Sequence, residues 1–198
     1  MVVPIPDKLI NETDTVLLIP AHEVLGIPNA ITPTGLVAYD ALTTAVLNRY
    51  APITSTGHAN AGAGGNVSCA IVSDGFTLSF TDSQEDDEKT LCEPANSVDL
   101  TDFGFDNDMT GFRDANPAAA DSVFALWKAL TFAPDVPYII VHRVGYASTV
   151  PFAVGQEIDV YYSHTDLPVN VHADGQKQKI QQVFISKSTA KPNYVLAA

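Results

Sequence analysis

Short apolar runs separated by turn residues recur along most of the chain, a pattern typical of β-strands. The pattern predicts strands over residues 15–19, 67–72, 76–81, 98–105, 109–112, 137–144, 156–163, 169–173, 176–187 and 194–196. In one of these runs, Ile158, Val160 and Tyr162 alternate with more polar positions, as a half-buried strand requires. The chain is therefore predicted to be mainly β.

Two Asp-Gly pairs, Asp74-Gly75 and Asp174-Gly175, lie between strand-like runs. Asp-Gly is a strong hairpin signal because the favoured two-residue turn needs positive φ at both central positions. We therefore expect a hairpin at each pair. The polar triplet at residues 106–108 is expected to interrupt the strands on either side of it.

The run at 176–187 carries apolar side chains on both of its faces. Ile180 and Phe184 point one way, whereas Val183 and Ile185 point the other way. Such a strand is covered by a helix, a second sheet or another subunit, or it is fully buried inside a monomer. The sequence leaves these alternatives open.

A first helix is predicted over residues 33–50. Thr32 is suited to the N-cap and Pro33 to the first helical position, where a missing N–H has no effect. The apolar residues that share one face at helical spacing are Leu36, Tyr39, Leu42, Val46 and Leu47. We expect this helix to cover a sheet.

A second helix is predicted after Asn116, which is a good N-cap, with Pro117 at the first helical position and Pro134 beyond its end. Its apolar stripe consists of Ala120, Val123, Phe124, Trp127 and Leu130. We expect Trp127 to anchor this helix against the sheet.

The length of 198 residues is compatible with a single domain over 1–198, with residues 1–14 as an extended N-terminal arm. The sequence shows no apolar run long enough to span a bilayer and no secretory signal. A soluble protein made in the cytoplasm is therefore expected. In that reducing setting, Cys69 and Cys92 are expected to be small buried side chains.

The net charge of −13 is unevenly distributed. From Asp74 to Asp121 there are 13 acidic residues against only Lys89 and Arg113, and a loop over residues 82–90 is especially acidic. This balance gives little attraction for phosphate backbones, which bind through Lys and Arg. Lysines gather near the C-terminus instead, so an acidic region of one subunit could meet a basic region of another.

No catalytic or metal-binding pattern is present in the sequence. The five histidines show no zinc spacing, and the calcium-loop mimic that begins at Asp106 places Pro117 where a bidentate Glu is required. No nucleophile elbow or isolated carboxylate pair occurs. The sequence predicts no enzymatic activity, no cofactor and no metal.

Four segments together resemble the major tail tube proteins of bacteriophages with long, non-contractile (siphovirus-type) tails. They are residues 82–93 (DSQEDDEKTLCE), 109–117 (MTGFRDANP), 151–162 (PFAVGQEIDVYY) and the C-terminal course from 174 to 198. The resemblance covers roughly residues 65–198 in the order of elements. The helix at 33–50 has no counterpart in the minimal fold of that family.

The resemblance implies an α+β fold of two packed antiparallel sheets, forming a sandwich or barrel, with residues 118–131 as a flanking helix. It further implies hexameric rings that stack into a hollow tail tube through which double-stranded DNA passes without sequence-specific binding. Implied partners are further copies of the chain, tail tip and tail terminator proteins, and a tape measure protein in the lumen during assembly. The implied location is the virion tail, assembled in the host cytoplasm.

The charged residues proposed to contact other subunits are Asp82, Glu85, Asp86, Asp87, Glu88, Lys177, Lys179, Lys187 and Lys191. Two other classes of function stay open at this point. One is a capsid decoration protein or another structural protein of the virion. The other is a secreted carbohydrate-binding β-sandwich, which would show an exposed aromatic row drawn from Tyr138, Tyr146, Tyr161 and Tyr162.

Overall fold

The structure is a computed structural model. It describes residues 14–25, 42–52, 64–81, 84–86, 99–102, 105–114, 122–186 and 190–197. Nearly all of the predicted N-terminal arm lies outside these ranges.

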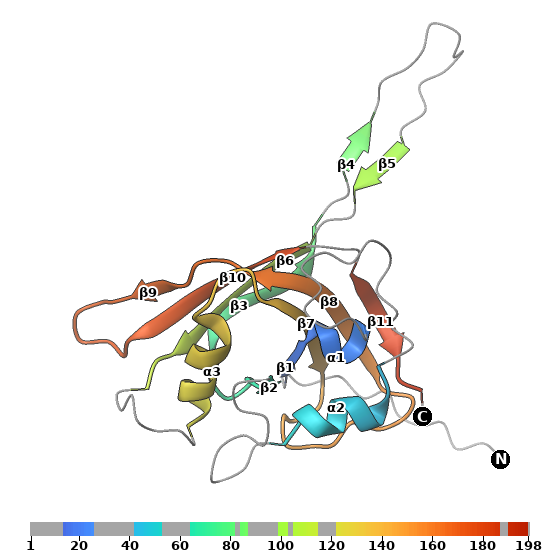
Figure 1. Cartoon of the computed structure of the whole chain (residues 1–198), viewed down its shortest axis with the longest axis horizontal. Coiled ribbons are helices and arrows are strands. Elements are labelled where there is room, and N and C mark those ends of the chain that lie inside the picture. The colour runs from blue at the N-terminus through green and yellow to red at the C-terminus, as the bar shows by residue number, and fades with distance from the viewer. Residues whose placement is uncertain are drawn as a thin grey trace, which may run out of the picture.

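Eleven strands make up most of the described chain, so the mainly β prediction is confirmed (Figure 1). They are β1 (Asp14–Pro20), β2 (Gly65–Asn66), β3 (Ile71–Phe80), β4 (Gln84–Asp86), β5 (Asp99–Asp102), β6 (Phe105–Phe112), β7 (Pro137–Val144), β8 (Glu157–Thr165), β9 (Val169–Val171), β10 (Lys179–Ser186) and β11 (Lys191–Val195). The strand predicted at 137–144 is reproduced residue for residue.

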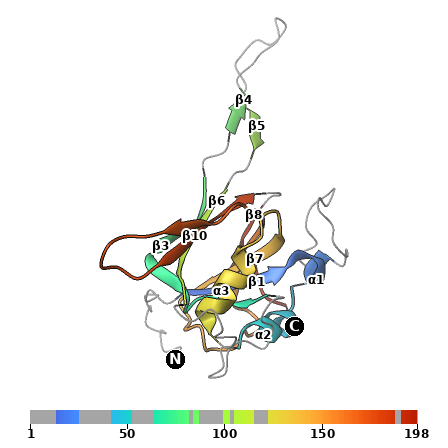
Figure 2. The same cartoon turned by 60° about the vertical axis from the view of Figure 1, so that its left-hand side comes forward.

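Nine of these strands form one antiparallel sheet in the order β2-β1-β7-β8-β10-β6-β3. β11 pairs with the first half of β8, and β9 pairs with β10 at the margin of the sheet. β4 and β5 form a separate two-stranded ribbon that stands off the body of the molecule (Figures 1 and 2).

The large sheet folds back on itself, so that it packs as two layers. Phe80 of β3 and Phe105 of β6 both contact the ring of Tyr161 on β8, each with ring centroids 5.3 Å apart. Phe76 of β3 reaches the ring of His142 on β7 at 5.8 Å. β3, β6 and β10 thus form an outer layer over the inner layer of β1, β7 and β8, consistent with the predicted sandwich.

The inner layer has a hydrophobic core on each of its faces. Toward the helices α1 (Ala21–Leu25) and α2 (Thr44–Tyr50), the core contains Leu17, Leu47, Ile139, Val160 and Tyr162 among others. Toward the outer layer and the helix α3 (Val123–Thr131), it contains Leu18, Met109, Trp127, Ile140 and Phe184 among others. Burial on both faces explains why β1 and β7 read as nearly continuous apolar runs.

α2 covers only the last part of the helix predicted over 33–50, of which residues 33–41 lie outside the described residues. Leu42 and Thr43 precede it in non-helical conformation, and Thr43 forms an extended bridge with Ala197. The predicted N-cap at Thr32 is therefore wrong for this helix. Its N-cap is Thr43, whose side chain accepts a hydrogen bond from the backbone N–H of Val46 at 3.4 Å.

α3 also begins later than predicted, because Ser122, with extended backbone, is its N-cap in place of Asn116. The anchoring role of Trp127 is confirmed. Its side chain is fully buried, and its Nε1–H donates to the carbonyl oxygen of Ile180 at 3.3 Å. A Cβ at Gly111 of β6 would approach the indole to 2.5 Å, so the helix packs tightly on the outer layer.

Two of the expected strand breaks are wrong. β3 runs through Asp74-Gly75 with an irregular register between Ile71 and Phe76, so the pair lies in a bulged strand and does not turn a hairpin. β6 likewise runs through residues 106–108, because Asn107 points inward and its amide donates to the Ser163 hydroxyl at 2.9 Å. Cross-strand partners thus override local turn propensity at both places.

The hairpin at Asp174-Gly175 is confirmed, but with a longer connection than a two-residue turn. β9 ends at Val171 and β10 begins at Lys179. Gly175 has a φ of 74°, whereas Asp174 is not among the residues with positive φ, and the N–H of Gln176 bonds to the carbonyl oxygen of Ala173 at 3.1 Å.

Candidate assembly surfaces

Among the described residues, the outer layer is covered on only one face. On β10, Ile180 and Phe184 are buried in the core, whereas Val183 and Ile185 are 44% and 45% exposed. On β6 the residues alternate in the same way, with Asp106 on the exposed side. The alternative of a strand fully buried within a monomer is therefore wrong for β10.

An exposed apolar strip crosses the margin of this layer. It consists of Leu167, Val169, Val171, Val183 and Ile185, which are between 36% and 68% exposed, and it is called the β9–β10 strip below. The ladder places Val169 opposite Gln181 and Val171 opposite Lys179, so both valines share a face with Val183. Among the described strands, β9 pairs only with β10, which leaves its other edge without a partner strand.

Of the acidic loop predicted over 82–90, the structure describes only residues 84–86, which form β4 of the ribbon, so the loop prediction is wrong there. Glu85 and Asp86 belong to β4, whereas Asp82, Asp87 and Glu88 lie outside the described residues. Because β4 follows β3 in the chain and β5 precedes β6, the ribbon extends from the end of the outer layer marked by Phe80 and Phe105. Figure 1 shows it projecting away from all three helices.

An open groove lies at the opposite end of the same two strands, between α3 and the end of β6. Its lining includes the aromatic rings of Phe112, Phe124 and Phe132, the cations of Arg113, Lys128 and Lys177, and Cys69. The rings of Phe112 and Phe124 meet edge to face at 6.2 Å. We refer to this feature as the α3 groove.

The predicted contact lysines occupy different places. The ammonium groups of Lys177 and Lys179 lie 5.3 and 5.8 Å from the centre of the Phe112 ring, and of the two only Lys177 lines the α3 groove. Lys191 of β11 lies over Tyr194 at 4.6 Å, and Lys187 is outside the described residues. The groove cations Arg113 and Lys128 come from separate segments, so sequence reasoning did not associate them with the C-terminal lysines.

Cys69 does not have the buried position expected of it. Its side chain is exposed and lines the α3 groove, where its sulfur lies 3.8 Å from the hydroxyl of Ser148. The residue lies in the turn before β3, where the neighbouring Val67 and Ala70 are the residues that enter the core. Cys92 lies outside the described residues.

A buried arginine organises the loop between β7 and β8. The Arg143 guanidinium donates to Thr15 Oγ1 at 3.2 Å and to the carbonyl oxygen of Val150 at 2.8 Å, and it lies 3.9 Å from the centre of the Phe152 ring. Burial lowers the pKa of Arg143, with a smaller opposing effect from Tyr146. These contacts fix the carbonyl groups of the loop, so we assign Arg143 a structural role.

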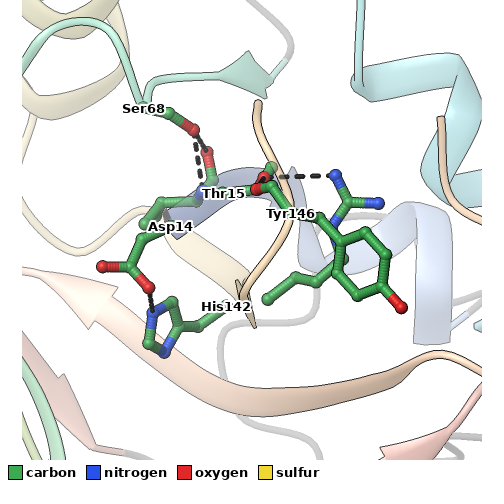
Figure 3. A network of polar contacts seen from close by, with 7 residues as sticks. Asp14, Thr15, Ser68, His142 and Tyr146 are labelled. Atoms are coloured by element: carbon green, nitrogen blue, oxygen red, sulfur yellow. Dashed lines mark hydrogen bonds and ion pairs between the residues drawn. The ribbon is translucent and has the colours of Figure 1, made fainter. Parts of the chain in front are cut away.

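Further polar contacts tie the start of β1 to its neighbours (Figure 3). The Thr15 hydroxyl donates to the carbonyl oxygen of Tyr146 at 3.1 Å, and Asp14 Oδ1 lies 3.2 Å from His142 Nε2. Ser68 Oγ accepts from the N–H of Val16 at 2.8 Å. The network thus joins β1, β7 and the segment before β3, so we assign it a structural role.

A second chain of contacts, buried at His164 and Tyr162 but exposed at Asp135, has the outline of a catalytic relay. His164 Nδ1 lies 2.7 Å from Asp135 Oδ1, and His164 Nε2 lies 3.0 Å from the Tyr162 hydroxyl. Tyr162 is fully buried, and burial, with a further effect of Asp135, raises its pKa. A phenol that is neutral and closed to solvent cannot attack a substrate, so the relay stabilises the fold. Among the described residues, no group of three or more His, Cys, Asp and Glu side chains could hold a metal ion.

The aromatic row that a carbohydrate-binding module needs is not formed. Tyr138, Tyr161 and Tyr162 are at most 5% exposed, and of the four candidates only Tyr146, at 41%, reaches the surface substantially. Burial raises the pKa of Tyr161, with an added effect of the Asp159 carboxylate. These tyrosines are core residues.

The fold and its surfaces define a class: a β-rich protein with a doubly covered inner layer, a half-covered outer layer and charged features at the two ends of that layer. Residues 27–198 match the phage tail tube protein family. The chain therefore belongs to that family and is a structural protein of the virion tail. A search of curated proteins found no match.

No helix in the described part of the chain is long and apolar enough to cross a membrane.

Proposed function

We propose that the whole chain, residues 1–198, acts as one domain that assembles into hexameric rings, and that the rings stack into the hollow tube through which the phage DNA passes. The long flexible tail type is part of this proposal. The proposal rests on the outer layer. The described chain leaves one face and one margin of this layer uncovered, and five exposed apolar side chains lie there.

Ring closure uses the β9–β10 strip. A surface that meets a different surface on the next copy generates a ring when the rotation closes. The exposed valines at 169 and 171 lie on an edge strand, and such edges associate with other chains unless they are covered. In this proposal, the margin of one copy contacts β3 of the next copy in the ring. β3 is the strand at the other end of the sheet order.

The bore uses the remaining part of the same face. Asp106 is exposed on β6. Carboxylates that face the bore repel the phosphates of passing DNA, so the polymer moves without sequence-specific binding. No chemical turnover is part of this function.

The same assembly accounts for the other partners implied by the resemblance. A tape measure protein occupies the lumen while the tube is built, and tail tip and tail terminator proteins cap its two ends. Assembly takes place in the host cytoplasm, and the finished tube is part of the virion. The charged residues at 82–88 and at 177–191 that were predicted to join subunits are assigned in this proposal to contacts between copies of the chain.

Electron microscopy of the purified protein tests this proposal, in parallel with gold labelling of virions by an antibody against the chain. We expect hollow rings or tubes in the first experiment and label along the whole tail in the second. Label confined to the capsid would contradict the proposal and favour a decoration protein. A monodisperse monomer at high concentration, even with tail tip protein added as a nucleator, would contradict ring formation.

A further inference from the structure

We propose that a bulge at residues 72–75 of β3 is a register stop, which lets β9 of the next copy pair only with residues 76–80. The inference rests on the proposed function and deepens it, because it names the feature that selects one register for the contact within the ring. The four residues, Val72, Ser73, Asp74 and Gly75, are called the β3 bulge below.

The β3 bulge is larger than an ordinary β-bulge. The ladder between β3 and β6 runs from the pair Ile71 and Gly111 directly to the pair Phe76 and Met109. Four residues of β3 thus lie opposite the single residue Thr110. A β-bulge ordinarily inserts a single extra residue, whereas this one inserts three. Beyond it the pairing with β6 is regular, so β3 has an irregular first half and a straight second half.

Close packing around a glycine holds the β3 bulge in place. A Cβ at Gly75 would lie 3.0 Å from the Cβ of Thr110 and 3.2 Å from that of Val72, so a side chain there would press on both. Val72 is buried, whereas Ser73 and Asp74 are exposed. Glycine at position 75 therefore permits the close approach on which the bulge depends, which explains an Asp-Gly pair within a strand.

The β3 bulge also removes the first half of the β3 edge from use by another chain. A neighbouring strand pairs with a regular row of backbone N–H and C=O groups, and a bulge disrupts that row. Val72 and Ser73 line a small pocket together with Asp14 and Val16 of β1, so this half of β3 faces its own chain. The exposed side chain of Asp74 adds a charge of the kind that protects natural sheet edges.

The straight half of the β3 edge is short enough to limit the register. Among the described strands, β3 pairs only with β6, so its edge at residues 76–80 is open. The three residues of β9 can lie against a straight ten-residue edge in eight registers, but against five residues in only three. A slip by one residue turns both valines of β9 to the other face of the sheet. At most two of the three registers therefore keep the β9–β10 strip on one face.

One register is needed because a ring closes only if no shift accumulates from copy to copy. A contact between two different surfaces generates a ring when the rotation closes and an open helical filament when it does not. The next register that keeps the same face is two residues away, which moves the neighbouring copy by about 7 Å along the strand. Copies joined in mixed registers would leave the plane of the ring. The β3 bulge therefore favours closed rings over filaments.

Removing the β3 bulge from the full-length chain tests this role. Deletion of Ser73, Asp74 and Gly75 removes the three extra residues, so the register with β6 becomes continuous. We expect the shortened protein to fold and to associate, but to lose closed rings in favour of open filaments and particles of mixed size. Electron microscopy counts the closed rings, native mass spectrometry measures the number of copies in each particle, and circular dichroism verifies the fold.

Asp74→Ser is the matched control, because it removes the charge but keeps the bulge. Closed rings in the same yield as those of the unchanged protein are expected. Loss of rings in this control would show that the charge selects the register, which would overturn the inference. If the deletion variant forms closed rings of the same size and yield as the unchanged protein, the inference is wrong while the proposed function stands. If the unchanged protein forms neither rings nor tubes, the proposed function itself fails.

A measurement on the unchanged protein does not depend on the folding of any variant. Amide hydrogen exchange is compared between the monomer and the assembled protein, residue by residue along β3. We expect assembly to slow exchange within residues 76–80 and to leave exchange at Ser73 and Asp74 unchanged. New protection at Ser73 and Asp74 would show that the neighbour pairs along the whole edge, and the inference would be wrong.

Discussion

The two layers of the sheet differ in how much of their surface the described part of the chain covers. Along β8 of the inner layer, every residue from Val160 to Thr165 is buried, whereas β10 of the outer layer alternates between buried and exposed positions. Both layers contribute to the core between them. The difference indicates that the inner layer serves folding alone, while the outer layer serves folding with one face and association with the other.

The largest loss of stability is expected from emptying the core between the layers. We expect Trp127→Ala to lower the free energy of unfolding by about 3–5 kcal/mol, because it removes a fully buried indole and leaves a cavity beneath α3. Urea unfolding followed by circular dichroism measures the change. The control is Phe132→Ala just beyond α3, where the ring is 65% exposed and the loss should stay below about 1 kcal/mol. Equal losses in the two variants would contradict this assignment of the core.

A somewhat smaller loss is expected at alkaline pH. Burial raises the pKa of Tyr138 from 10.0 to about 12, and its hydroxyl donates to the carbonyl oxygen of Leu130 at 3.0 Å. The unfolded chain releases this proton at lower pH than the folded chain does. Stability is therefore full below pH 10 and falls by about 3 kcal/mol as the pH rises through 12.

Comparison with Tyr138→Phe isolates this effect. The variant loses one hydrogen bond at neutral pH, but we expect it to lose less stability between pH 10 and 12 than the unchanged protein does. Urea unfolding at several pH values measures both. The assignment would be refuted by identical slopes in the two proteins, because the other buried tyrosines, Tyr161 and Tyr162, remain in both.

Charge placed on the open face should leave the fold intact and abolish association. We expect Val183→Lys with Ile185→Lys to change the free energy of unfolding by no more than about 0.5 kcal/mol per site, because both side chains are exposed in the single chain. Assembly should be lost, since the strip no longer excludes water between neighbours. Sedimentation measures the oligomeric state. A variant that still forms rings would show that the β9–β10 strip is not a subunit contact.

The smallest structural effect is expected from Asp106→Lys, at an exposed position on β6. Stability and tube formation should be unchanged within about 0.5 kcal/mol, but the inner surface becomes less negative. Empty tubes of this variant should retain short double-stranded DNA at low salt more strongly than unchanged tubes do, as measured by co-sedimentation. Equal retention would mean that Asp106 does not face the bore.

The sequence predicted the elements whose signals are long and consistent. The strand at 137–144 and the core role of Trp127 follow from apolar runs and helical spacing, and both are confirmed. The predictions for Asp74-Gly75 and residues 106–108 were wrong because turn propensity is a local property. Backbone pairing with a neighbouring strand keeps these residues in the strand. The ends of the helices were misplaced because several Ser, Thr and Asn residues compete as N-caps.

The candidate surfaces were predicted less completely. The acidic run is evident in the sequence because its residues are adjacent. The α3 groove is not, because Arg113, Lys128 and Lys177 are far apart in the chain and meet only when α3 packs on β6. The exposed side of β10 was recognised as apolar, but only the fold shows that the chain itself covers one of its faces.

Amide hydrogen exchange, compared between the monomer and the assembled protein, tests most directly whether the outer layer is the layer of association. The account predicts that assembly slows exchange at β9 and β3 and leaves β1 and β7, already covered on both faces, unchanged. Unchanged exchange at β9 and β3 in the assembled state, or new protection confined to other segments, would contradict it.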